Sequence, residues 1–103
     1  MIHRDVLVGH EQGVHALVAH ELAVRAAGFA SSLYLRHEDR SASLTRVVDI
    51  LALGLAAGIR VTVWADGEDE AEALDALAGY LASPEQQLKP ITPAPPGAPK
   101  GEQ

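Results

Sequence analysis

The chain has 103 residues, no cysteine and a formal net charge of −6, from eight basic and fourteen acidic side chains. This length suits one domain, and the lack of cysteine excludes disulfides, thiolate metal sites and cysteine nucleophiles, while the acidic balance with only 4% aromatic residues argues against nucleic-acid binding. No stretch resembles a signal segment or a membrane span, so the sequence predicts a cytoplasmic protein.

The N-terminal part of the chain predicts a strand, a loop and a helix. Residues 5–8 form a short apolar run typical of a strand, and residues 9–13 predict a loop. Residues 16–29 predict a helix, and Gly28 suits its C-terminal end. The helix prediction depends on apolar residues at helical spacing, namely Ala19, Leu22, Ala23 and Ala26.

Two strands and a short helix are predicted next. Residues 32–36 predict the second strand, and residues 41–43 predict a short third strand after a polar turn. Residues 46–53 predict a short helix, for which Ser43 or Thr45 could supply the N-cap hydroxyl.

The clearest strand of the chain follows, and then a last helix. Residues 60–65 alternate strongly, so Val61 and Val63 are expected to face the core and the residues between them an open face of the sheet. Residues 69–81 predict a helix with acidic residues in its first turn.

The predicted order of elements is β-α-β-β-α-β-α. This order indicates the α+β class, with one sheet covered by helices on one face. All six prolines lie in the last part of the chain. Residues 1–85 are therefore expected to form the domain, and residues 86–103 a disordered Pro-rich tail.

The most informative candidate residue is His15, which stands directly before the first predicted helix. At such a position the unpaired backbone N–H groups of the first helical turn point toward the imidazole. This arrangement suits an anion held on or beside the ring, above all a phosphoryl group. The ordinary alternative is a surface histidine that ends a loop.

Five short motifs in the sequence are similar to those of a known family. They fall in the family's order and at its spacing without gaps, and the resemblance as a whole covers about residues 5–81. The motifs are Gly13-Val14-His15, Ala26-Ala27-Gly28-Phe29, Ser41-Ala42-Ser43, Leu53-Gly54-Leu55 and Glu68-Asp69-Glu70-Ala71. On these motifs the chain resembles HPr, the histidine-containing phosphocarrier family of the sugar phosphotransferase system.

The resemblance implies a fold and a function. The fold would be an open-faced sandwich of a four-stranded antiparallel sheet with three helices on one face. His15 would accept a phosphoryl group on Nδ1 from enzyme I and pass it to a histidine of an enzyme IIA-type protein. The backbone amides of Ala16, Leu17 and Val18 would bind the phosphoryl oxygens. Such a protein is a phosphoryl carrier rather than a turnover enzyme, and it needs no cofactor, nucleic acid or membrane.

The chain departs from the family directly after the histidine. The family has a short polar residue, an arginine and a proline there, and this chain has Ala16, Leu17 and Val18. An arginine can hydrogen-bond phosphate oxygens, and losing one such contact costs roughly 1.5–3 kcal/mol. Arg46 occupies the place of the family's regulatory serine, so no serine control is expected. Arg46 either replaces the missing arginine or is a solvated charge at a helix start.

The sequence also predicts an apolar partner-binding surface on the first two helices. Leu17 and Val24 are seven residues apart and therefore lie on the same side of the helix, away from its core-facing residues. The short second helix has too many apolar residues to bury them all. The predicted partner-binding residues are Leu17, His20, Val24, Val47, Val48 and Leu51. Val24, Ala27, Thr45 and Asp49 replace basic residues common in the family, which would weaken the electrostatic steering of an acidic partner.

The remaining histidines predict no further site. His3, His10, His20 and His37 lack the spacing of a metal site and are expected to be solvated surface residues. A second function therefore stays open beside the phosphocarrier. In that alternative the chain is a degenerate HPr-like module that regulates a partner through its apolar surface without transferring phosphate.

Overall fold

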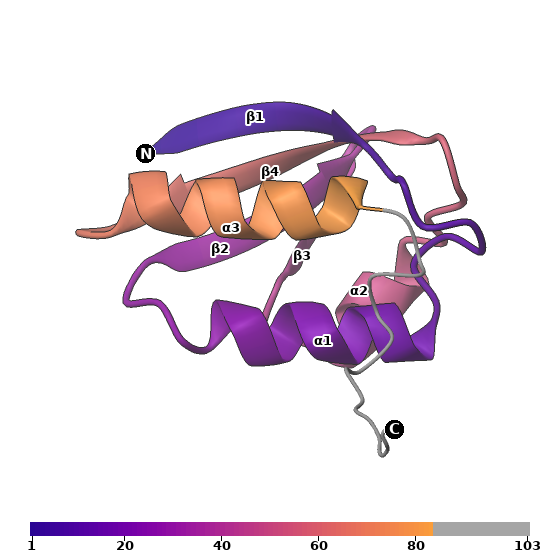
Figure 1. The fold of residues 1–103 in the computed structure, drawn as a ribbon, viewed down its shortest axis with the longest axis horizontal. Helices are drawn as coiled ribbons and strands as arrows, with labels where there is room; N and C mark the ends of the chain where they lie inside the picture. Colours follow the sequence, from indigo (N-terminus) through magenta and orange to yellow (C-terminus); the bar gives the residue numbers. More distant parts are fainter. Residues whose placement is uncertain (84–103) are drawn as a thin grey trace, which may run out of the picture.

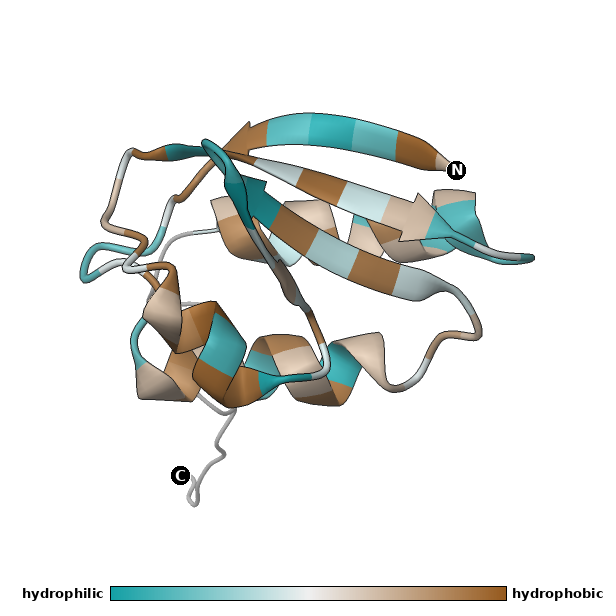
Figure 2. Cartoon of the chain, turned by 180° about the vertical axis from the view of Figure 1, so that it is seen from behind, coloured by the Kyte–Doolittle hydropathy of each residue, from teal (hydrophilic) through white to brown (hydrophobic). Residues whose placement is uncertain are grey.

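A computed structural model describes residues 1–83 of the chain. Its elements occur in the predicted order, which confirms the α+β class and the open-faced sandwich. The helix α3 lies in front of the strands in Figure 1 and behind them in Figure 2, so one face of the sheet is covered and the other is open. The elements are β1 (Ile2–Leu7), α1 (Ala16–Ala26), β2 (Ser32–His37), β3 (Arg40–Ser43), α2 (Val47–Ala52), β4 (Arg60–Asp66) and α3 (Glu70–Ala82).

The sheet is antiparallel throughout, with the strand order β1-β4-β2-β3. In β4, Val61 and Val63 are buried against the helices. The residues that alternate with them, Arg60, Thr62 and Trp64, face the open side, as the alternation predicts. Val63 pairs with Leu35 of β2, so apolar side chains from neighbouring strands meet on the covered face.

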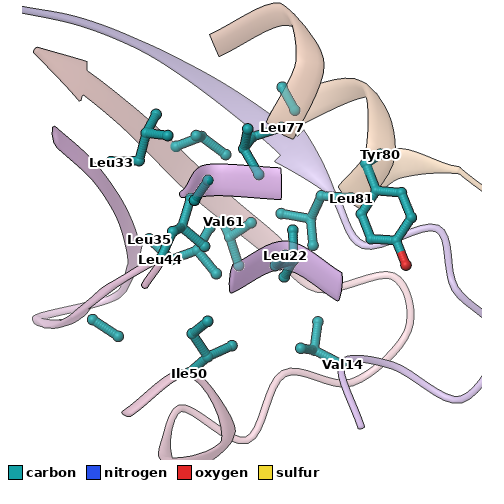
Figure 3. Packing of buried hydrophobic residues seen from close by; sticks show 14 of the residues in the cluster. Val14, Leu22, Leu33, Leu35, Leu44, Ile50, Val61, Leu77, Tyr80 and Leu81 are labelled. Carbon is teal, nitrogen blue, oxygen red and sulfur yellow. The ribbon is translucent and has the colours of Figure 1, made fainter. Parts of the chain in front are cut away.

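The core lies between the covered face of the sheet and the three helices. Figure 3 shows Leu22 of α1, Ile50 of α2 and Leu77 of α3 converging on side chains of the sheet. These three residues have no exposed surface. Burying a leucine or isoleucine contributes roughly 1.5–3 kcal/mol. The contacts of these three side chains therefore fix the position of each helix, α1 included, relative to the sheet.

Two predicted elements, a helix and a strand, are each wrong by three residues at one end. The helix predicted over residues 16–29 ends at Ala26. The amides of Gly28 and Phe29 bond carbonyls only three residues back, which tightens the chain out of the helix. The strand predicted over residues 5–8 is Ile2–Leu7, because Ile2 is already paired with Ala65 of β4.

The predicted cap of the second helix is also wrong. Arg46 stands at the N-cap of α2 in place of Ser43 or Thr45. The two hydroxyl groups lie 2.9 Å apart and bond each other in the turn that precedes the helix. The predicted division between a domain of residues 1–85 and a tail of residues 86–103 stays a prediction, since residues 84–103 lie outside the described part.

Asp69 joins the loop after α1 to the start of α3. Its carboxylate accepts hydrogen bonds from the backbone N–H groups of Ala30 and Ser31, each at 2.9 Å, and from the Ser31 hydroxyl. The Ser31 hydroxyl, followed by the Ala30 N–H, lowers the pKa of Asp69 below its ordinary value of 3.8. The folded state therefore favours the ionised carboxylate.

This bond network predicts a loss of stability in acid. Because the folded pKa of Asp69 lies below the unfolded value of 3.8, its stabilisation is complete above that value and is lost as the pH falls through the folded pKa. We expect the free energy of unfolding of Asp69→Asn to be lower at neutral pH but to change less between about pH 5 and pH 2. Urea denaturation across this range measures both effects. Asp39→Asn, in the exposed β2–β3 turn, controls for the loss of one charge, and an equal change there would contradict the assignment.

Candidate functional site

The loop between β1 and α1 is held by main-chain bonds to distant parts of the chain. Val8 donates to the carbonyl of Ile59 at 2.9 Å, and its own carbonyl accepts from Gly58 at 2.8 Å. Gly9 donates to the carbonyl of Leu81 in the last turn of α3, at 3.1 Å. The start of this loop is therefore fixed both on the residues just before β4 and on the end of α3.

The end of the loop is fixed by Gly13 and Val14. The N–H of Val14 donates to the carbonyl of Leu55 at 2.8 Å, and the N–H of Gly13 donates to the carbonyl of His10 at 2.9 Å. Gly13 has a φ of +74°, and a Cβ built on it would overlap the Leu55 carbonyl oxygen. Only glycine combines this backbone angle with this close approach.

We expect Gly13→Ala to lower the free energy of unfolding and to displace His15. Backbone strain at a left-handed position contributes roughly 1–3 kcal/mol, and the overlap with Leu55 adds to it. Gly54→Ala is a matched control, because Gly54 has a φ of +64° but open space where its Cβ would lie. Urea denaturation of both variants isolates the contact with Leu55. Equal losses of stability would show that this contact has no influence.

His15 caps the first helix with its own ring. It has extended backbone angles, and its carbonyl accepts the first helical bond, from Ala19 at 2.9 Å. Its Nδ1 accepts a hydrogen bond from the N–H of Leu17 at 3.3 Å. A ring nitrogen that accepts a bond carries a lone pair, so the neutral ring has its proton on Nε2. In the half-buried His15, Nδ1 is therefore the ring nitrogen that carries a lone pair.

The surroundings of Nδ1 favour negative charge. The amides of Ala16, Leu17 and Val18 precede the first helical bond of the eleven-residue α1. The first turn holds no acidic residue, and the positive end of the helix dipole points at the ring. The side chain of Val18 is buried in the core, which holds these amides in place.

No cationic side chain takes the place of the family arginine in the sequence after His15. Leu17 is 55% exposed and contributes only apolar surface there. Arg46 is exposed, and its Nε lies 2.8 Å from a carboxylate oxygen of Asp49 on its own helix. This ion pair agrees with the prediction of a solvated charge and gives no support to Arg46 as a substitute for the arginine.

The predicted apolar surface is present where α1 and α2 lie side by side, and Figure 2 shows brown segments on both helices. Leu17 and Val24 are 55% and 53% exposed, and Val48 is 78% exposed. The charged side chains on these helices form two ion pairs, Glu21 with Arg25 and Arg46 with Asp49. We call this the α1–α2 surface and define it as Leu17, His20, Val24, Val47, Val48 and Leu51. Val47 is half-buried and packs against the core.

The prediction that His10 is a solvated surface residue is wrong. His10 has no exposed surface, and its Nε2 lies 2.9 Å from the carbonyl oxygen of Tyr80. Its burial continues the alternation of Val6 and Val8, which was the signal in the sequence that indicated it. His37 is half-buried, with Nδ1 3.4 Å from the Arg60 carbonyl, whereas His3 and His20 are exposed.

The described part of the chain shows neither a metal cluster nor a membrane-spanning helix. Within residues 1–83, no three histidine, aspartate or glutamate side chains come together as metal ligands. Among the helices of the same residues, none is both long and apolar enough to cross a membrane.

Relatives of known identity match almost all of the described chain. A family model described as the PTS HPr component phosphorylation site matches residues 2–83. The phosphocarrier protein HPr of Lysinibacillus sphaericus is 38% identical over 69 residues, which cover 67% of this chain and 78% of that protein. The HPr of Cupriavidus necator is 30% identical over 83 residues, which cover 81% of this chain and 93% of that protein.

A solved structure agrees with these matches. The crystal structure of an HPr from Thermoanaerobacter tengcongensis superposes with a TM-score of 0.75 and 26% identity, covering 79% of this chain and 91% of that one. With the sandwich fold and a histidine at the N-cap of α1, these matches show that the chain belongs to the HPr family of phosphocarrier proteins of the phosphotransferase system.

Proposed function

We propose that His15 accepts a phosphoryl group from an enzyme I-type donor and passes it to a histidine of an enzyme IIA-type acceptor. The observation that carries the proposal is the hydrogen bond from the Leu17 N–H to Nδ1, because it marks Nδ1 as the ring nitrogen with a lone pair. A neutral imidazole is a usable nucleophile near neutral pH.

The transfer needs no general acid or base. The Nδ1 lone pair forms a bond to phosphorus, and the P–N bond of the donor histidine breaks with its electron pair returning to the donor nitrogen. Nε2 of His15 keeps its proton or releases it to water. The same exchange in reverse, with a different partner histidine, delivers the phosphoryl group onward.

The backbone of α1 stabilises the phosphoryl group in this mechanism. Once phosphorus occupies the lone pair of Nδ1, the Leu17 amide donates to a phosphoryl oxygen, together with the amides of Ala16 and Val18. Without the family arginine, the phosphorylated state loses roughly 1.5–3 kcal/mol of stabilisation. For that reason the phosphoryl group on His15 is stabilised less than in a carrier that has the arginine.

The α1–α2 surface is the proposed docking site for both partners. It adjoins His15 through Leu17, and its apolar side chains would be buried on contact. Because the charged residues beside this surface, on the same two helices, form ion pairs with each other, the surface offers little net charge to an acidic partner. We therefore infer partners with apolar contact surfaces. Partners of the enzyme I and enzyme IIA type would place the protein in the cytoplasm.

The proposal is tested by incubating the wild-type protein with phosphoenolpyruvate and enzyme I of its own organism. We expect one phosphoryl group per chain, labile in acid and stable in base, as a phosphohistidine requires. Subsequent addition of an enzyme IIA-type protein should remove it. If no label appears with the organism's own enzyme I, the proposal fails.

The alternative is a partner-binding module that regulates without phosphotransfer. Leu17 in place of the arginine, together with the exposed apolar α1–α2 surface, favours it. In that case the protein would bind a partner through this surface with equal affinity whether His15 is present or replaced. The labelling experiment separates the two functions, because only the carrier becomes phosphorylated.

A further inference from the structure

A second histidine lies in the loop that carries His15, and its ring is completely buried. His10 Nε2 lies 2.9 Å from the carbonyl oxygen of Tyr80. A carbonyl oxygen can only accept a hydrogen bond, so Nε2 carries the proton and donates it. The carbonyl of His10 in turn accepts from the N–H of Gly13 at 2.9 Å. His10 thus connects the end of α3 to the glycine two residues before His15.

The bond partner of His10 belongs to a cluster that joins three elements. Tyr80 lies in the last turn of α3, and its ring centroid is 5.1 Å from that of His10. The guanidinium carbon of Arg25, on α1, lies 4.3 Å from the centroid of the same tyrosine ring. Figure 3 shows Tyr80 at the edge of the core with its hydroxyl pointing away from it. Loop, α1 and α3 therefore meet at these side chains, which we call the His10 cluster (His10, Arg25 and Tyr80).

The loop has little freedom to adjust between its two points of attachment. At one end a Cβ on Gly9 would overlap the carbonyl oxygen of Ala82, so the backbone runs directly against the end of α3. At the other end Val14 is bonded to Leu55. Only the exposed residues Glu11 and Gln12 separate Gly13 from His10. A displacement of the His10 residue would therefore be passed to Gly13, whose N–H bonds the His10 carbonyl, and so toward His15.

The histidine is a poor choice for this site if only packing is considered. Within residues 1–83, His10 Nδ1 and the Tyr80 hydroxyl are buried without a hydrogen-bond partner. Burying unpaired polar atoms opposes folding, and an apolar side chain would fill the same space without that penalty. What the ring supplies that an apolar side chain lacks is the bond from Nε2 to α3.

We propose that His10 is a positioning residue for His15, acting through its bond to the Tyr80 carbonyl. The bond holds the loop so that the His15 Nδ1 faces the Leu17 amide. The kinetic part of this inference rests on the proposed phosphocarrier function. The structural part, the placement of the His15 ring, does not.

Three variants separate the hydrogen bond from packing. His10→Leu keeps much of the volume and removes the donor, whereas His10→Gln keeps an N–H donor at a similar reach. Leu74→Val, in the buried early part of α3, is a control that lowers stability away from the loop. If His10→Leu does not fold, His10→Met provides a more adaptable apolar side chain.

Two measurements are made on each variant. In the unphosphorylated protein, NMR gives the ¹⁵N shift of His15 Nδ1 and the hydrogen exchange of the Gly13 and Leu17 amides. With phosphoenolpyruvate and enzyme I, the rate of phosphoryl acceptance is measured. We expect His10→Leu to change the Nδ1 shift, to speed both exchanges and to slow acceptance about tenfold or more, since small misplacements of a reacting group have effects of this size. In His10→Gln the Nδ1 shift, the two exchange rates and the rate of acceptance should be close to those of the wild-type protein. Leu74→Val should change none of them.

The outcomes are distinguishable from failure of the proposed function. If the wild-type protein accepts no phosphoryl group, the carrier proposal fails, and the NMR measurements still decide the role of His10. If His10→Leu leaves the Nδ1 shift and both amides unchanged, the positioning role is overturned. If His10→Gln and His10→Leu are equally impaired, packing rather than the hydrogen bond is what matters, and the proposal is also overturned.

Discussion

Replacement of His15 by alanine is expected to abolish phosphoryl acceptance. The variant lacks the one nitrogen that the structure presents with a lone pair at the start of α1. The fold should persist, because losing the N-cap contact costs only about 1 kcal/mol. Incubation with phosphoenolpyruvate, labelled in its phosphate, and the organism's enzyme I measures the effect as acid-labile label per chain.

The control for this experiment is another histidine on a different face. His3 is exposed and its ring stacks on Trp64, with the ring centroids 4.3 Å apart. His3→Ala should take up label at the wild-type level. Equal labelling of wild-type protein and His15→Ala would place the phosphoryl group elsewhere and remove the basis of the proposed mechanism.

Leu17→Arg is expected to change the rates with two kinds of donor in opposite directions. The arginine restores a charge-assisted contact to the phosphoryl oxygens, worth about 1.5–3 kcal/mol, or roughly one to two decades in rate with an enzyme I of the ordinary, acidic type. The same substitution places a charge in an apolar contact and removes the burial of a leucine, so acceptance from the organism's own enzyme I should slow about tenfold or more.

Val24→Arg separates contact with phosphate from a general effect of charge. It adds the same charge to the α1–α2 surface two helical turns away, beyond reach of Nδ1. If it accelerates the ordinary donor as much as Leu17→Arg does, steering rather than phosphate contact is the cause. If Leu17→Arg improves both donors, Leu17 is a defect and no special partner surface exists. If neither rate changes, residue 17 does not approach the phosphoryl group.

The order of elements could be predicted because its signals are local. The alternation in residues 60–65 and the helical spacing of residues 16–26 depend on which side chains face the core, and both are visible in the sequence. The boundaries were less accurate, because they depend on partners far along the chain. Ile2 is part of β1 only because Ala65 of β4 pairs with it.

The candidate site likewise has features that the local sequence predicts and features that depend on distant residues. His15 could be placed at an N-cap from its own neighbours, since a helix start is a local feature. The bond from Val14 to the Leu55 carbonyl could not be predicted, because it joins loops forty residues apart through backbone atoms that every residue has. The burial of His10 had a weak signal in the alternation of Val6 and Val8, but its partner lies on α3, seventy residues away.

The loop that carries His15 is held mostly by bonds between peptide groups, whereas an approaching partner would contact side chains. The carbonyls of His10 and Leu55 place the histidine, while Leu17 and Val24 stand outward from the scaffold. These two layers can diverge independently over evolution. Under the proposed function, substitution of the outward residues would change the preferred donor and leave the placement of His15 as it is. Two such carriers in one cell would then transfer phosphoryl groups separately, because neither would accept them from the donor of the other.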